Sequence, residues 1–244
     1  MTLLHLRSRA RLGITALALS TAACGGGGGG GGGGSSATSG STSCPTYAVG
    51  NRFIYNHSSV TAYAGYPPLT PVTFTRTVTV TNTASGTADM QATFSNSSDV
   101  DRYFHESTST RFALTRTTHT HTGGTDTATY VTPFQICTQP AVGTMYTANV
   151  QNADGSTNSG TSTVTAVSAE AVTVPAGNYP SARRIAYLTK FYDGTGAYLS
   201  GSDIATKLWF DDAVGVVKEE TSKTISVAGF TGTVVNTITL QSFP

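Results

Sequence analysis

Charged residues are scarce in this chain of 244 residues: Asp, Glu, Lys and Arg make up 11% of it, and the formal net charge is +1. A nucleic-acid-binding protein normally carries a basic surface that neutralises phosphates, and a weakly charged chain lacks that footprint. The sequence also has no cluster of Lys and Arg of the kind that attracts anionic lipids. We therefore expect no nucleic-acid partner and no electrostatic attachment to a membrane.

Helical patterns are equally scarce, because no window has the apolar spacing of an amphipathic helix of three or more turns. The dominant pattern is instead a period of two. Along residues 71–80, apolar side chains at alternate positions share one face and threonines occupy the other. Similar segments, separated by Gly, Asp-Gly and Pro turns, lie at residues 87–95, 111–120, 127–134, 144–151, 161–174, 182–192, 204–210, 214–221 and 232–243.

This pattern predicts an all-β fold with little helix. We expect about ten antiparallel strands in a strongly curved sheet, a half-barrel or a barrel. Residues 45–244 are enough for one sizeable core, so they are predicted to form a single β domain.

The amino terminus has a different composition. Three arginines precede a short apolar stretch from Leu12 to Leu19, which is followed by small residues. This order is typical of an export signal. The stretch is shorter than the roughly 20 residues that a membrane-spanning helix needs. Residues 1–23 are therefore predicted to be a signal peptide.

The segment Leu19–Cys24 resembles the lipobox of bacterial lipoproteins, with Thr21 where that family prefers leucine. The resemblance implies cleavage after Ala23, a diacylglyceryl group on the Cys24 sulfur and acylation of the new amino group. Gly25 stands where an aspartate retains Gram-negative lipoproteins at the inner membrane. By that analogy we expect outer-membrane sorting, if the organism has an outer membrane. The alternative is an ordinary secretory signal that ends beside a cysteine.

Gly25–Gly34 are ten consecutive glycines, and a Ser- and Thr-rich stretch follows them to Ser43. Such a segment has almost no apolar side chains to bury, so it cannot repay the entropy lost on ordering. Residues 24–44 are therefore interpreted as a lipidated cysteine with a flexible tether. About 19 residues of this composition have a root-mean-square span of about 25 Å.

Acylation of Cys24 would leave Cys44 and Cys137 as a candidate disulfide, since disulfides persist in the oxidising compartments that exported proteins reach. Two unpaired thiols are the alternative. The spacing of these cysteines fits no cysteine pattern for a metal site.

Three motifs of the domain lie in Tyr47–Tyr55, Val172–Ile185 and Leu208–Lys218. Together they are similar to a pattern in poorly characterised bacterial envelope lipoproteins, in the same order over most of residues 47–221. The resemblance implies a half-barrel like that of lipoprotein carriers of the LolA/LppX type. Those carriers also have helices that plug a lipid cavity, and this sequence shows no obvious equivalent.

His119 and His121 form the sharpest candidate site. Residues two apart in a strand share a face, so both imidazoles could meet one metal ion, with Asp126 as a third ligand. The alternative is a pair of solvated polar side chains, and no HExxH-type motif supports the metal interpretation.

Aromatic residues are spread along the domain, where they could line a concave face that holds an apolar or glycan ligand, or simply pack in a core. They are Tyr55, Tyr63, Tyr66, Tyr103, Tyr130, Tyr146, Tyr187, Tyr192 and Trp209.

The leading hypothesis is a non-enzymatic, membrane-anchored envelope lipoprotein without a cofactor, which binds an apolar ligand or a protein partner on its curved sheet. One alternative is a purely structural or surface-display lipoprotein. The other is a metal-assisted hydrolase that uses His119 and His121.

Overall fold

The computed structural model describes residues 44–244, apart from residues 85, 110, 228 and 229. The predicted signal peptide, Cys24 and the glycine tether lie outside this range. The described residues form strands and no helix, and accordingly none of them belongs to a helix long and apolar enough to cross a membrane.

The strands are β1 (Arg52–Tyr63), β2 (Val72–Asn82), β3 (Thr87–Phe94), β4 (Val100–Thr108), β5 (Arg111–His121), β6 (Gly124–Gln135), β7 (Met145–Gln151), β8 (Thr157–Val174), β9 (Gly177–Tyr192), β10 (Ile204–Asp211), β11 (Gly215–Val227) and β12 (Phe230–Ser242).

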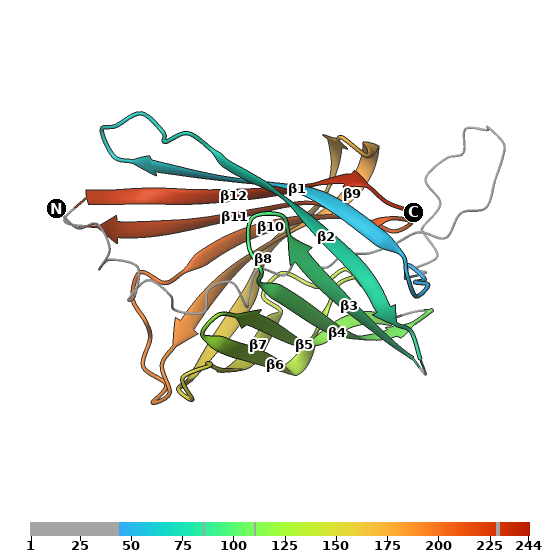
Figure 1. Ribbon diagram of the computed structural model, residues 1–244, viewed down its shortest axis with the longest axis horizontal. Coiled ribbons are helices and arrows are strands. Elements are labelled where there is room, and N and C mark those ends of the chain that lie inside the picture. The colour runs from blue at the N-terminus through green and yellow to red at the C-terminus, as the bar shows by residue number, and fades with distance from the viewer. Residues whose placement is uncertain (1–43, 85, 110, 228–229) are drawn as a thin grey trace.

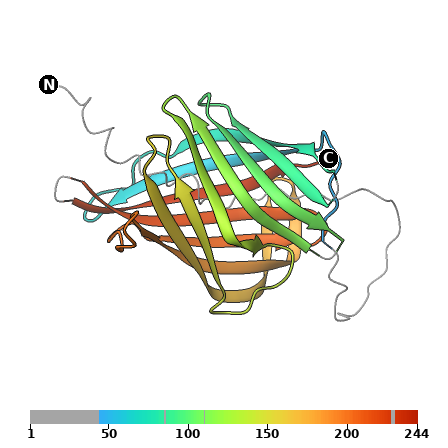
Figure 2. The ribbon, with the colours of Figure 1, turned by 90° about the horizontal axis from the view of Figure 1, so that it is seen from below.

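Each strand pairs with its neighbours in sequence, and β1 pairs antiparallel with β12, so the sheet closes into a barrel. The strands of one wall, β10 to β12 and β1, cross those of the opposite wall, β3 to β7, at a steep angle (Figures 1 and 2). Among the described strands, closure leaves none at an open end of the sheet. The predicted all-β, barrel-like fold is confirmed.

The core lies inside the barrel because inward positions alternate with outward ones. In β2, Arg76, Val78 and Val80 are buried, while the intervening threonines are partly exposed. The same alternation continues around the barrel and produces a single cluster of buried apolar and aromatic side chains. The outward positions are rich in threonine, which suits a pleated surface that faces solvent.

Ten predicted segments overlap ten of the twelve described strands, and β1 and β4 are the two that the pattern did not predict. The reason is chemical. The inward positions of β4 carry Asp101, Tyr103 and His105, all buried, and the inner face of β1 changes from aromatic residues to His57 along its length. A search for alternating apolar residues cannot find a strand whose buried face is polar.

The first described residue, Cys44, is joined to Cys137 by a disulfide with a Cα–Cα distance of 5.5 Å. The backbone N–H of Cys44 also donates a hydrogen bond to the carbonyl of Ser109, at 3.0 Å. These bonds fix the point where the predicted tether meets the folded domain.

The β8–β9 hairpin is the longest of the barrel and turns at Gly177, which has a φ of 152°. Residues that carry a side chain rarely adopt this backbone conformation, so the position requires glycine. The predicted turn at residues 175–178 therefore has its expected place between two strands.

Candidate functional site

His119 and His121 lie on the same face of β5, as their spacing predicts, and their rings stack with centroids 5.3 Å apart. Each ring faces its own carboxylate. The Nδ1–H of His119 donates to Oδ1 of Asp101 at 2.7 Å, while Nε2 of His121 lies 3.4 Å from Oδ2 of Asp126. Asp126 is the cross-strand neighbour of His119 on β6, so the three predicted residues do meet.

These residues meet as hydrogen-bond partners rather than as a set of metal ligands. Nδ1 of His121 accepts a hydrogen bond from the backbone N–H of Gly123, at 2.9 Å. The other oxygen of Asp126 accepts one from the N–H of Ala153, at 2.8 Å. Among the described residues, no group of three or more His, Cys, Asp or Glu side chains is arranged to hold a metal ion.

The pair of His119 and Asp101 continues as a chain of hydrogen bonds into the barrel. The hydroxyl of Tyr103 donates to Oδ2 of Asp101 at 2.7 Å, and Nη2 of Arg76 donates to the oxygen of Tyr103 at 2.6 Å. The four residues come from β2, β4 and β5, and all are buried. We call them the Asp101 chain.

Three of the described histidines, His57, His105 and His119, differ in their charge behaviour. The hydrogen bond to Asp101 raises the pKa of His119 above its ordinary value, although burial opposes it. By contrast, burial lowers the pKa of His105 and of His57 to about 4. His105 donates from Nδ1 to the carbonyl of Ala88 at 3.0 Å and stacks on Phe112, so it is a neutral core residue.

Two further charged side chains lie inside the barrel, Arg76 and Glu219, which are 2% and 1% exposed. Burial by itself lowers the pKa of Arg76, but Tyr103, Asp101 and Glu219 together raise it above its ordinary value. Burial raises the pKa of Glu219 to about 7, even though Arg76 acts to lower it. Neither carboxylate oxygen of Glu219 accepts a hydrogen bond from a described residue.

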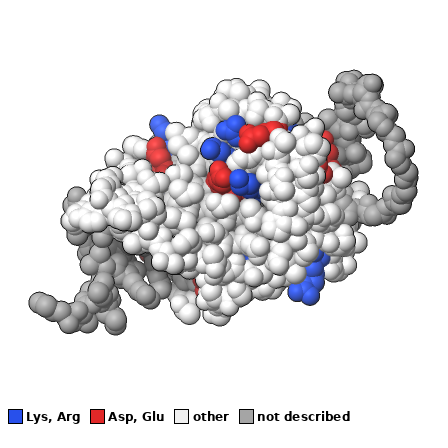
Figure 3. Space-filling model, turned by 90° about the horizontal axis from the view of Figure 1, so that it is seen from above, with Lys and Arg blue, Asp and Glu red and all other residues white. Residues whose placement is uncertain are grey.

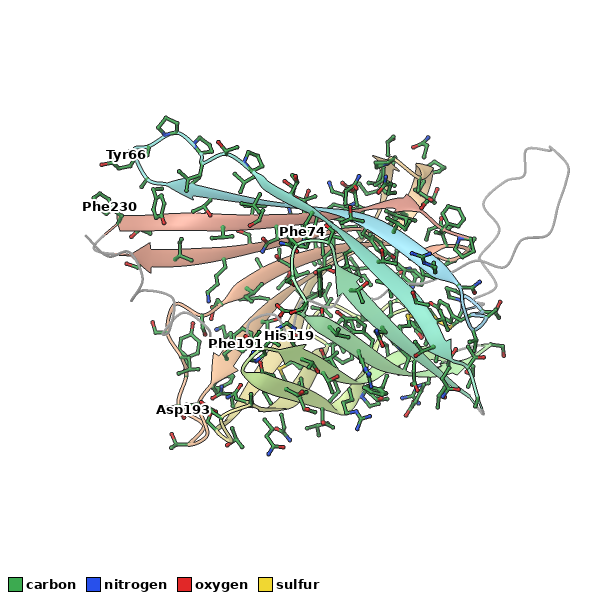
Figure 4. All side chains as sticks on the ribbon, in the orientation of Figure 1. Tyr66, Phe74, His119, Phe191, Asp193 and Phe230 are labelled. Carbon is green, nitrogen blue, oxygen red and sulfur yellow. A yellow bond between two sulfur atoms is a disulfide. The ribbon has the colours of Figure 1, made fainter. Side chains whose placement is uncertain are left out.

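Many of the aromatic residues noted in the sequence point into the barrel. Tyr55, Tyr103, Tyr130, Tyr146, Tyr187 and Trp209 are buried, whereas Tyr66 is exposed. Tyr66 packs edge-on against Phe230 at one tip of the molecule, far from His119 (Figure 4).

Four aromatic residues inside the barrel form one group around Phe134. Its ring centroid lies 4.3 Å from that of Tyr146, 5.6 Å from that of Tyr187 and 6.2 Å from that of Tyr130. We call these four residues the aromatic cluster. It joins β6, β7 and β9, and Tyr187 interacts electrostatically with Glu219 on β11.

The sequence did not single out Arg76, Asp101 or Glu219. A signal for Arg76 exists, because it occupies an inward position between Phe74 and Val78 in a strand that was predicted. Asp101 lies in a strand that was not predicted, and its partner His119 is 18 residues away.

No protein-family model matches the chain, and no curated protein matches it in sequence. Among solved structures, it is similar to that of a candidate lipoprotein from Parabacteroides distasonis ATCC 8503. The sequence identity is 11% and the TM-score 0.39, with 81% of this chain and 96% of that chain covered. A likeness of this size carries no information about a shared site.

Proposed function

We propose that this chain is a lipid-anchored protein of the bacterial cell envelope, whose barrel is held at a membrane through Cys24 and has no catalytic role. The proposal rests on the order of three segments along the chain: a lipobox-like motif, a glycine tether and a folded barrel. A lipobox-like Leu19–Cys24 is followed directly by Gly25–Gly34, and the barrel begins with β1 at Arg52, after Cys44. A glycine tether of this length has an obvious use between an anchor and a folded domain.

The disulfide supports this arrangement. Cys44 lies where the tether reaches the barrel, and it is bonded to Cys137 between β6 and β7. A force applied along the tether would therefore act on the disulfide before it acted on β1. Because disulfides persist outside the reducing cytosol, the bond also agrees with export.

The chemistry of the interior favours binding or scaffolding over catalysis. One of the two histidines that the hydrolase alternative would use, His119, is buried and hydrogen-bonded to Asp101, which also accepts from Tyr103. Outside, one face of the molecule shows a few charged side chains of both signs among many uncharged ones (Figure 3). This sparse charge supports the expectation that nucleic acid is not a partner.

In an organism with two membranes, the protein would be anchored in the outer one. The reason is that the residue after Cys24 is Gly25 and not the aspartate that retains lipoproteins at the inner membrane. The anchor also makes an envelope protein a natural partner for the barrel, as expected from the sequence.

Metabolic labelling with palmitate tests the anchor. The wild-type chain should carry the label and sediment with membranes, whereas the Cys24→Ser variant should lose both properties. Cys44→Ser is the matched control, because it removes the disulfide and leaves the lipobox intact, so it should stay labelled. Labelling that persists in Cys24→Ser would refute the proposal.

A further inference from the structure

Glu219 is a costly residue in this fold. Its side chain is 1% exposed, and both oxygens lack a hydrogen bond from the described residues. Buried polar groups are nearly always paired, and an unpaired buried carboxylate costs more than an unpaired neutral group. Such an exception requires an explanation, for example a ligand that supplies the missing donors.

The side chain faces the interior of the barrel. Its cross-strand neighbours are Leu208 on β10 and Ile238 on β12, which are also buried and share its face of the sheet. Neither neighbour can donate a hydrogen bond. The nearby cation, Arg76, donates to Tyr103 and is surrounded by the carboxylate of Asp101 as well as that of Glu219.

The aromatic cluster also comes within reach of Glu219, through Tyr187. Tyr187 interacts with the carboxylate electrostatically and packs against Phe134. Within the same cluster, the hydroxyl of Tyr130 is also buried and without a hydrogen-bond partner among the described residues. A carboxylate with open oxygens beside several aromatic rings is the combination that recognises an organic ammonium group.

We propose that the interior of the barrel binds a small primary-ammonium ligand, whose nitrogen donates hydrogen bonds to Glu219 and lies against the aromatic cluster. The ammonium would supply the hydrogen-bond donors that the carboxylate lacks, and it would add a second positive charge beside that of Arg76. A neutral alcohol would supply donors without the charge, and an anion would be repelled. The sequence predicted an apolar ligand, and this proposal adds an ammonium group at one end of it.

Calorimetric titration of the full-length mature protein in detergent tests the site, with 2-phenylethylammonium as the probe and 2-phenylethanol as its neutral counterpart. The ammonium should bind saturably at one site, and the alcohol should bind far more weakly. Glu219→Gln should weaken ammonium binding by about 10- to 100-fold, as expected for a lost charge-assisted hydrogen bond.

Glu220→Gln is the matched control. Glu220 is next in the chain, points to the opposite face of β11 and contacts Lys218 at 2.7 Å, so its loss should leave binding unchanged. Equal binding of the alcohol and the ammonium, no binding of either, or unchanged binding by Glu219→Gln would overturn the proposal.

A crystal structure of the wild-type protein soaked with the ammonium gives a test that does not depend on any variant. The nitrogen should lie within hydrogen-bond distance of Glu219, and density for water alone at that position would refute the site. Palmitate labelling is independent of all these outcomes, so the anchor and the ligand site can fail separately.

Discussion

Two carboxylates are buried at similar depth in this barrel and have opposite surroundings. Asp101 on β4 is 5% exposed and accepts hydrogen bonds from Tyr103 and His119. Glu219 on β11 is 1% exposed and accepts none from the described residues. Hydrogen bonds to a buried carboxylate stabilise its charge, while burial alone disfavours it.

Burial by itself therefore does not decide what a charged residue does. Asp101 accepts from Tyr103 on its own strand and from His119 on β5, and Tyr103 accepts from Arg76 on β2, so the carboxylate helps to fix how β2, β4 and β5 lie together. Glu219 lies between two apolar neighbours and costs stability whenever it is ionised. Groups with strongly perturbed pKa values and no structural use are candidates for function.

The largest effect is expected for Asp101→Asn, which replaces the carboxylate that is fully hydrogen-bonded. An amide cannot accept from both Tyr103 and His119 as a carboxylate does, and Arg76 loses a nearby negative charge. We expect a loss of about 3–5 kcal/mol in the free energy of unfolding, typical of a buried ionic network that loses one partner. Urea denaturation at neutral pH measures it, with Glu220→Gln as an outer-face control. A loss no larger than that of the control would show that Asp101 is not structural.

Glu219→Gln should have the opposite sign. The folded-state pKa of Glu219 is raised from 4.5 to about 7, so the folded protein holds this proton more tightly than the unfolded chain does. The stability from this group is complete below about pH 4.5 and is lost as the pH rises through 7. In the ligand-free protein, the amide variant should be more stable than wild type by about 3 kcal/mol at pH 8.

The same two proteins should be nearly equal in stability at pH 4, where Glu219 is protonated in both states. Comparing wild type with the variant at each pH is necessary because His57 and His105, with pKa values lowered to about 4, act in the opposite direction over acidic pH. The titratable groups that interact electrostatically with Glu219 are Arg76 and Tyr187, and neither changes in the variant. A variant less stable than wild type at pH 8 would show that Glu219 has a partner in solution.

The comparison also shows how far the sequence alone could predict this protein. Strands with apolar inner faces, such as β2 and β3, are predicted by their alternation, and these set the fold class. β4 was missed because its inner face is Asp101, Tyr103 and His105. The buried polar side chains of β4 are therefore the reason that an alternation of apolar residues did not predict this strand.

The candidate site was predictable only within one hairpin. The period of two places His119 and His121 on one face, and the short turn after them brings Asp126 alongside. The contact between His119 and Asp101 instead depends on the register of β4 against β5, which contains a bulge between Phe104 and His105. Glu219 and the aromatic cluster come together only when the whole barrel closes, and no local spacing encodes that.

The smallest expected effect concerns the far end of the Asp101 chain, at His119. Its pKa is raised, so the stability from its protonation is present below pH 6.5 and is lost as the pH rises through the folded-state pKa. His119→Gln keeps a donor but cannot take up a proton. It should therefore cost about 1 kcal/mol more at pH 6 than at pH 9. The groups that face His119 are Asp101, Asp126, Asp99 and the stacked ring of His121. Urea unfolding of the variant in the Asp101→Asn background tests the source of this effect, because the pH-dependent part should vanish there if it comes from the hydrogen bond to Asp101.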